Sequence, residues 1–230
     1  TNITSCNIAD TTKVIYESAF SSCCNLTSIT IPSGVTSIMN QAFSECYALA
    51  EVYNLSSSIT LTKGSSSNGC LAYYVQDSDA IYTSLSTPSR ISEENGVKYY
   101  TNGSKVVALT VANKSNESIS IKQGCTEINK CAFFQCSSLT SIKIPNSVTS
   151  IGSSAFLGCS SLTSITIPSS VTSIGSGAFG AALSLTITCE SANVGTESIG
   201  RGMYFTPTGE TKGKSMIYKW QTGTGVYTNA

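Results

Sequence analysis

Ten cysteines and the complete absence of histidine decide what chemistry this 230-residue chain could perform. Without histidine, the chain lacks the commonest general base, the usual activator of a serine or cysteine nucleophile and the commonest zinc ligand. No two cysteines have the C-x-x-C spacing that indicates a zinc site. We therefore expect the protein to bind neither a metal ion nor a cofactor.

Two short motifs could suggest catalysis, and neither has the context that its chemistry needs. Glu93-Glu94 is the only adjacent acidic pair, and it precedes a run of strand-forming residues, where a solvated turn is the simpler interpretation. Residues 209–215 (GETKGKS) resemble a phosphate loop, but their glycines are four residues apart where that motif needs five. We expect no catalytic residues and no enzymatic activity.

The composition also limits the possible partners. Lys and Arg together number 13, as do Asp and Glu, so the formal net charge is zero and phosphate-driven binding to nucleic acid has little electrostatic basis. No apolar run approaches the roughly 18 residues of a membrane-spanning helix. The first residues, TNITSCNIAD, contain no basic region followed by an apolar one, so no signal peptide is visible. For an extracellular chain we expect that such a peptide has been removed.

A 23-residue period runs through most of the chain and indicates a repeat protein. An Ala-Phe pair recurs at residues 19–20, 42–43, 132–133, 155–156 and 178–179. An isoleucine lies four residues before each pair, and a cysteine follows each of the first four pairs by three residues. One unit therefore reads C-x-x-L-x-x-I-x-I-P-x-x-V-x-x-I-x-x-x-A-F-x-x. A single unit cannot bury these apolar columns alone, whereas stacked units can.

Each unit is expected to form one turn of a solenoid. Leu139, Ile142 and Ile144 have the spacing of a short strand whose apolar side chains point inward. Pro145 ends that strand because proline cannot donate to a strand ladder. The Val-x-x-Ile segment then crosses the core, and the Ala-Phe pair follows in a short helical or 3-10 turn with its Phe buried.

Cysteines in register are expected to form a column of buried free thiols, at Cys23, Cys46, Cys136 and Cys159. Stacked turns about 4.8 Å apart could bring neighbouring cysteines within bridging distance. Parallel side chains in one column, however, seldom present the geometry of a disulfide. Cys6 and Cys125 occupy aliphatic columns, and we interpret them in the same way. The pairing of the irregular cysteines cannot be read from the sequence; these are Cys24, Cys70, Cys131 and Cys189.

The segments L-x-x-I-x-I-P, V-x-x-I and A-F-x-x-C together resemble the BspA-like leucine-rich repeats, also called the Treponema pallidum type. The resemblance covers about residues 1–55 and 113–205. It implies an α/β leucine-rich-repeat solenoid of about seven units, mostly β with short helical or 3-10 turns and a parallel sheet on the concave face. It also implies a secreted or surface-exposed protein of mucosal bacteria or protists that adheres to host proteins or makes cell–cell contacts.

We interpret the chain as one continuous solenoid with a β-hairpin insertion. N-terminal repeats occupy residues 1–55, a β-rich insertion 56–112, C-terminal repeats 113–205 and a C-terminal cap 206–230. In the insertion, Asn102-Gly103 predicts a hairpin with a type I′ turn. The last unit is one residue short at Leu183, Leu185 and Ile187, and residues 216–220 (MIYKW) are expected to form a final strand over the open end.

The binding surface is predicted from the strand positions that alternate with the inward residues. On the concave sheet these positions carry mainly hydroxyls, and the candidate binding residues are Tyr53, Thr140, Lys143, Thr163 and Thr166. The insertion supplies further tyrosines, Tyr73, Tyr74, Tyr82, Tyr99 and Tyr100. Alternation along residues 97–100 should turn some of these tyrosines outward. They could equally form the insertion's own core, and the hydroxyls could serve only to keep the sheet soluble.

Two functions fit these patterns. The first is a non-enzymatic extracellular recognition or adhesion module that binds host or neighbouring-cell proteins or glycans. The alternative is a structural spacer within a larger cell-surface protein, without a ligand of its own. The sequence does not indicate the oligomeric state, and it identifies no particular ligand.

Overall fold

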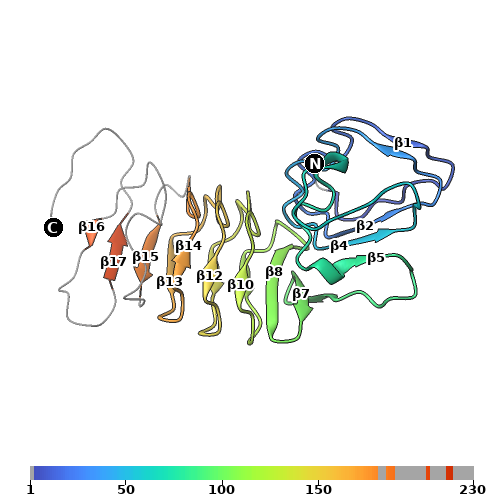
Figure 1. The fold of residues 1–230 in the computed structure, drawn as a ribbon. Helices are drawn as coiled ribbons and strands as arrows, with labels where there is room; N and C mark the ends of the chain where they lie inside the picture. Colours follow the sequence, from blue (N-terminus) through green and yellow to red (C-terminus); the bar gives the residue numbers. More distant parts are fainter. Residues whose placement is uncertain (1–2, 181–184, 190–205, 208–215, 220–230) are drawn as a thin grey trace. The chain divides into compact units, whose positions relative to one another are not determined.

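A computed structural model of the chain describes residues 3–180, 185–189, 206–207 and 216–219. It is a mostly β solenoid with almost no helix, as the repeat predicts. The chain divides into two compact units, Thr1–Ile91 and Ser92–Ala230, hereafter unit 1 and unit 2 (Figure 1). Its arrangement as one continuous solenoid with the predicted segment boundaries stays a prediction.

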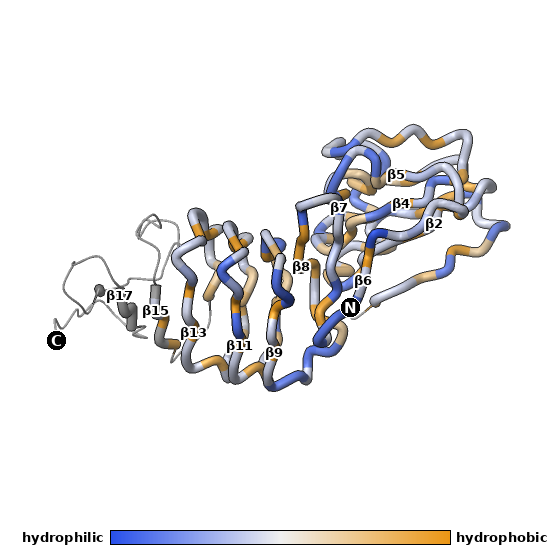
Figure 2. The backbone as a smooth tube through the Cα atoms, turned by 90° about the horizontal axis from the view of Figure 1, so that it is seen from below, coloured by the Kyte–Doolittle hydropathy of each residue, from blue (hydrophilic) through white to orange (hydrophobic). Residues whose placement is uncertain are grey.

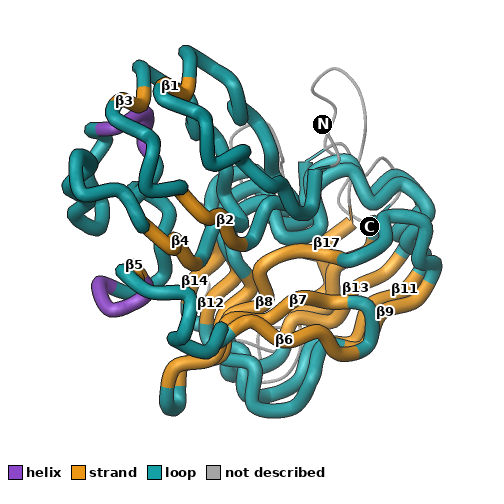
Figure 3. The backbone as a smooth tube through the Cα atoms, turned by 90° about the vertical axis from the view of Figure 1, so that its right-hand side faces the viewer, coloured by secondary structure: helices purple, strands orange, loops and turns teal. Residues whose placement is uncertain are grey.

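Each regular turn of the solenoid contains two short strands connected by loops (Figure 3). Strands in the L-x-x-I-x-I segment, and β5, which pairs with one of them, are called front strands here. Strands in the V-x-x-I segment are called back strands. In unit 1 the front strands β2 (Ser28–Ile31), β4 (Glu51–Asn54) and β5 (Ile81–Tyr82) form one parallel sheet. The back strands β1 (Val14–Ile15) and β3 (Ser37–Ile38) pair in parallel behind them.

Unit 1 continues for one turn beyond the point where the sequence period is lost. Ile29 pairs with Val52 at the regular step of the repeat, whereas Val52 pairs with Ile81 at a longer step. The longer turn holds two 3-10 helices, η1 (Asn68–Cys70) and η2 (Ser78–Ala80). The additional residues of this turn therefore lie in its loops, and its strand β5 still pairs with β4.

Unit 2 begins with an antiparallel cap and continues as stacked turns. Its back strands β10 (Glu127–Ile128), β12 (Ser150–Ile151) and β14 (Ser173–Ile174) extend a sheet that starts with β6 (Ile91–Glu94), β7 (Val97–Asn102) and β8 (Lys105–Val111). Its front strands are β9 (Ser118–Ser120), β11 (Ser141–Lys143), β13 (Ser164–Ile167) and β15 (Thr186–Cys189) (Figure 2).

The predicted hairpin is confirmed, but its predicted turn type is wrong. Strands β7 and β8 are antiparallel, and Asn102 is the last paired residue, opposite Lys105. The two turn residues are therefore Gly103 and Ser104, of which only Gly103 has a positive φ. A second Asn-Gly pair, Asn95-Gly96, joins β6 to β7 with φ values of 52° and 73°, which is the backbone of a type I′ turn.

At the other end, the parallel ladder of front strands passes into an antiparallel one. Strand β17 (Met216–Lys219) pairs antiparallel with β15 and with β16 (Thr206–Pro207). The strand predicted over residues 216–220 is thus present for its first four residues. The predictions for Leu183, for residues 209–215 and for Trp220 lie outside the described residues.

The core is a set of columns that repeat from turn to turn. Phe133, Phe156 and Phe179 are fully buried and stacked, with ring centroids 5.0 and 5.3 Å apart and interplanar angles of 3° and 1°. The amide of Phe133 donates to the carbonyl of Ala155 one turn later, at 2.7 Å. The predicted Phe column is therefore a hydrogen-bonded stack.

The Ala-Phe segments have 3-10-type hydrogen bonds but form no continuous helix. The amide of Cys136, for example, donates to the carbonyl of Phe133 at 3.2 Å. Residues on both sides of each pair have positive φ, such as Cys131 at 58° and Gln135 at 57°. This left-handed conformation interrupts a right-handed helical run.

Replacing the middle ring of the Phe stack tests how far the stack determines stability. Phe156→Ala removes a fully buried ring between two others, and we expect it to lower the free energy of unfolding by about 3–5 kcal/mol. Phe134→Ala, at a half-buried ring outside the stack, is the matched control and should cost far less. Denaturant unfolding measures both values, and equal losses would contradict the stack as the main source of stability.

Candidate functional site

The front strands of unit 2 present the exposed hydroxyls that the sequence predicts, but the solenoid itself uses several of them. Thr140 Oγ1 donates to the carbonyl of Glu117 at 2.8 Å, and Ser141 Oγ donates to Ser118 Oγ at 2.9 Å. Thr149 and Thr172, each one residue before a back strand, donate to the preceding turn in the same way. These side chains extend the backbone ladder, so their hydroxyls are not free for a ligand.

Three predicted residues on these front strands keep their polar groups available. Lys143, Thr163 and Thr166 are exposed, and their side chains make no hydrogen bond or ion pair with the described part of the chain. The front ladder is also interrupted here, because β11 pairs only with β9 while β13 pairs with β15. Ile142, in the same inward column as the buried Ile119 and Ile165, is consequently only partly buried.

Tyr99 and Tyr100 do not lie on the surface. Both are fully buried, so the prediction that alternation turns one of them outward is wrong. Tyr99 belongs to the core of unit 2, where its hydroxyl accepts the Lys122 amide at 3.1 Å. Burial raises the pKa of Tyr99 to about 12. Strand β7 is thus buried on both faces, whereas alternation turns a side chain outward only where one face is solvated.

In unit 1, a buried carboxylate closes the outer side of the front strands. Glu51, on strand β4, is fully buried. It accepts hydrogen bonds from the hydroxyl of Tyr82 at 3.1 Å, the hydroxyl of Ser89 at 2.7 Å and the amide of Arg90 at 2.6 Å. These bonds hold the segment 84–90 against the sheet. Tyr82 is buried as well, which agrees with the alternative that tyrosines of the insertion form a core.

Tyr53 lies at the border of this closed region. It is half-buried, its ring centroid lies 4.8 Å from that of Tyr82, and its hydroxyl donates to the carbonyl of Thr87 at 3.5 Å. Burial, and then the neighbouring Glu51 carboxylate, raise its pKa. Tyr53 thus belongs mainly to the packing of the 84–90 segment.

Tyr73 and Tyr74 form the exposed aromatic surface of unit 1. Tyr73 is 51% exposed, and its ring packs edge-on against Tyr74 with centroids 5.0 Å apart. Tyr74 in turn packs edge-on against Tyr47 at 5.2 Å, and its hydroxyl accepts the Glu45 amide at 3.1 Å. We call Tyr47, Tyr73 and Tyr74 the tyrosine platform. Its half-buried members fix the orientation of the exposed ring.

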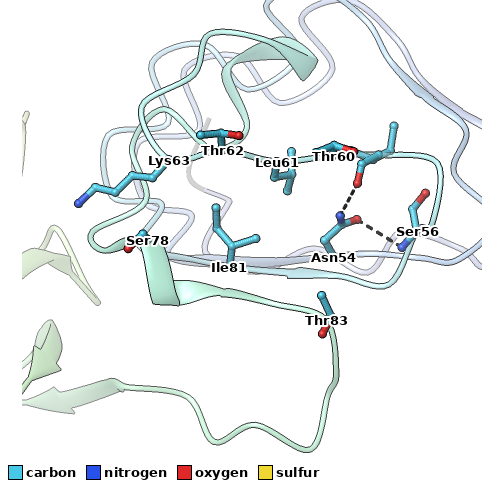
Figure 4. A pocket seen from close by; sticks show the side chains of 10 residues that line it. Asn54, Ser56, Thr60, Leu61, Thr62, Lys63, Ser78, Ile81 and Thr83 are labelled. Atoms are coloured by element: carbon cyan, nitrogen blue, oxygen red, sulfur yellow. Dashed lines mark hydrogen bonds between the residues drawn. The ribbon is translucent and has the colours of Figure 1, made fainter.

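A cavity of about 480 Å³ lies in the long turn of unit 1 (Figure 4). Its lining combines aliphatic side chains, hydroxyls, one amide and one ammonium group. The lining residues are Asn54, Ser56, Ile59, Thr60, Leu61, Thr62, Lys63, Ser78, Ile81 and Thr83. None of them was a sequence candidate, because the period that located the other features is absent here. The alternation of apolar and polar residues in Ile59-Thr60-Leu61-Thr62 was the sequence signal that could have located it.

The cysteine column is buried as predicted. Cys46 Sγ donates to the carbonyl of Phe20 at 3.0 Å, and Cys159 Sγ donates to that of Phe133 at 3.2 Å. Burial raises the pKa of both thiols to about 12 and that of Cys136 to about 11. Among the described residues, no group of three or more Cys, Asp or Glu side chains could hold a metal ion.

Removing the Glu51 carboxylate should destabilise unit 1. Glu51→Ala leaves three donors without their acceptor, and we expect a loss of at least about 3 kcal/mol in the free energy of unfolding. Glu17→Ala, at an exposed carboxylate of the same unit, should change it by less than about 0.5 kcal/mol. Denaturant titration compares the two variants, and a loss no larger for Glu51→Ala would refute this role.

Thiol reactivity separates the column from the surface cysteines. Because the thiolate is the reacting species, Cys46, Cys136 and Cys159 should resist iodoacetamide at neutral to mildly alkaline pH, well below their raised pKa values. The half-buried Cys6 and Cys70 should react first. Peptide mass spectrometry after a timed reaction gives the order, and labelling of Cys159 as fast as Cys6 would contradict the buried column.

Comparison with known proteins agrees with this architecture. Six copies of a repeat model, described as BspA type leucine rich repeat region, match residues 1–73 and 109–206. Among curated proteins none matches this chain at a significant level. None of the helices in the described residues is both long and apolar enough to cross a membrane.

Several solved structures are similar to this chain. A leucine-rich repeat protein from Eubacterium ventriosum is 25% identical, with a TM-score of 0.49 over 79% of this chain and 58% of that one. The pneumococcal vaccine antigen PcpA is 20% identical, with a TM-score of 0.45 over 75% and 47%. A leucine rich cell surface protein from Faecalibacterium prausnitzii is 22% identical, with a TM-score of 0.35 over 84% and 55%.

The chain thus spans about half the length of these solved proteins. The repeat model, by contrast, matches most of the chain. The chain belongs to the family of BspA type leucine rich repeat proteins.

Proposed function

We propose that this protein is a non-enzymatic recognition or adhesion module that acts outside the cell. Its partner is a protein or glycan of a host or neighbouring cell. The observation that carries the proposal is the tyrosine platform, which holds a large aromatic side chain in a fixed, exposed position. The surface location implied by the family is consistent with this role.

The platform has the properties of an interaction hot spot. Tyrosine is enriched among the few residues that supply most of the energy of a protein interface. The exposed Tyr73 ring is supported by Tyr74, whose hydroxyl bond to the Glu45 amide limits its rotation. An ordered side chain loses little conformational entropy on binding. The Glu45 carboxylate beside it, which accepts a bond from Ser22 at 2.9 Å, adds an acceptor for a polar partner group.

A second contact area is formed by Lys143, Thr163 and Thr166 in unit 2. These side chains are exposed and make no bond with the described part of the chain. The two threonines can make polar contacts with a partner and the lysine a charged one, but this area has no aromatic side chain to anchor the partner. Under this proposal they contribute to specificity more than to affinity.

The rival function, a structural spacer without a ligand, has one observation in its favour. Several hydroxyls of the repeats donate to the preceding turn, as Thr140 does to Glu117 and Thr172 to Thr149. Such a surface completes its own hydrogen bonds and needs no partner. The spacer accounts for the regular turns, but it does not account for the exposed and supported Tyr73 ring.

A matched pair of tyrosine variants tests the recognition function. The full chain is screened against immobilised extracellular-matrix proteins and a glycan array, and the Kd of each positive partner is then measured. We expect Tyr73→Ser to weaken binding about tenfold or more. Tyr16→Ser, at a tyrosine that is 67% exposed and outside the platform, should leave it unchanged.

Two outcomes would contradict the proposal. If the intact protein bound nothing in either screen, the spacer function would stand instead. If the Tyr16 and Tyr73 variants bound equally well, the platform would not be the binding surface. Circular dichroism of each variant confirms that the fold is retained.

A further inference from the structure

A strand-like segment of unit 1 has no strand partner. Residues 59–62 read Ile-Thr-Leu-Thr, in which buried Ile59 and half-buried Leu61 alternate with exposed Thr60 and Thr62. This alternation of apolar and polar residues, rich in β-branched side chains, is typical of a half-buried strand. Nevertheless, no described strand of either unit pairs with it.

The main chain of this segment is rich in unused donors. Its carbonyls at Ile59 and Thr60 accept from the side-chain amides of Asn54 and Asn68, at 2.7 and 2.9 Å. By contrast, the backbone N–H groups of residues 60–63 have no acceptor in the described part of the chain. Backbone donors in folded proteins are almost always paired with a protein group or with water. A run of free donors along a strand-like segment is a template for the addition of a further strand.

The cavity lies directly against this segment (Figure 4). Ile59, Leu61 and Ile81 give it aliphatic walls. Its outer residues carry hydroxyls that make no hydrogen bond with the described part of the chain, namely Thr60, Thr62, Ser78 and Thr83. Its volume of about 480 Å³ falls within the range of about 300–1,000 Å³ that is usual for ligand sites.

The charge at the cavity is balanced within the chain. Lys63 Nζ donates to the carbonyl of Gln76 and lies 3.9 Å from a carboxylate oxygen of Asp77. No other charged residue lines the cavity. The cavity therefore favours an uncharged ligand segment over an anion.

We propose that this cavity binds an extended, uncharged peptide segment of a partner protein. The segment adds as a strand along residues 60–63, its carbonyls accept those of the N–H groups that face one edge, and small aliphatic side chains at alternate positions enter between Ile59, Leu61 and Ile81. This inference rests on the proposed recognition function but uses a different surface from the tyrosine platform. A saccharide fits less well, because the lining contains no aromatic ring on which a sugar could stack.

Nuclear magnetic resonance of the isotope-labelled full chain tests the proposal. The probes are blocked hexapeptides in which threonine alternates with alanine, valine or leucine, titrated to about 1 mM. We expect saturable shifts of the amide signals of residues 60–63. Hydrogen exchange at the donors that become paired should slow by about tenfold.

Two tryptophan variants, one at the cavity rim and one elsewhere, test whether the peptide occupies the cavity. Thr83→Trp puts a large ring at the exposed rim and should weaken binding about tenfold. Thr172→Trp, at an exposed threonine one residue before back strand β14 of unit 2, is the matched control and should have no effect. Equal affinities of the two variants would overturn the assignment of the cavity.

A proline pair tests strand addition itself. Thr62→Pro and Lys63→Pro each remove one N–H group that has no acceptor in the chain. Because successive N–H groups of a strand point to opposite edges, one of these variants should abolish binding and the other retain it. Lys63→Ala separates the loss of the Lys63 side chain from the loss of its N–H. Equal binding by both proline variants would exclude a main-chain ladder.

The remaining outcomes identify other occupants. Shifts that appear only with uncharged tetrasaccharide probes, and that Thr83→Trp removes, would overturn the peptide in favour of a glycan. Shifts that depend on protein concentration without any probe would show that a second copy fills the cavity. If no probe shifts the amides of residues 60–63, the proposal fails, while the platform variants test the recognition function separately.

Discussion

The hydrogen bond that joins the amide of a repeat Phe to a backbone carbonyl of the next turn is the constraint on which this architecture depends. This bond is 2.7 Å long from Phe133 to Ala155 and 2.6 Å long from Phe156 to Ala178. It sets the offset between equivalent residues of successive turns to one repeat length. Once that step is set, the Phe rings stack and, within each unit, the cysteines fall into a buried column. The strands themselves are only two to four residues long in these turns, so the ladder at the Ala-Phe turns carries much of the register.

The same constraint explains why the regular turns offer little to a ligand. Identical residues lie above one another, so a threonine hydroxyl is within reach of the backbone of the preceding turn, as at Thr149 and Thr172. Polar groups of the repeats are therefore largely satisfied inside the stack. Free donors and ordered exposed rings occur where the spacing departs from the repeat length, at residues 60–63 and at Tyr73.

The sequence predicted the stacked columns because burial in a solenoid acts on the same position of every turn. It could not predict the long turn, since a period search requires equal spacing, whereas the step that pairs Val52 with Ile81 is longer than the repeat. The burial of Tyr99 and Tyr100 was missed because alternation gives the face of a side chain but not what covers that face. Of the three Asn-Gly pairs, Asn68-Gly69 lies in η1 and Asn95-Gly96 forms the type I′ turn. Strand register decides between Asn95-Gly96 and Asn102-Gly103.

The long turn combines three departures from the regular repeats: an unpaired strand-like segment, a cavity beside it and hydroxyls without intramolecular bonds. An unpaired edge reduces solubility, and natural proteins keep such features mainly where function needs them. The edge is also short, and it contains the charged Lys63 and the exposed Thr60 and Thr62. Charged and polar residues on an edge hinder indiscriminate strand pairing. A segment that stays soluble alone, yet keeps its donors free, is suited to take up a strand from a specific partner.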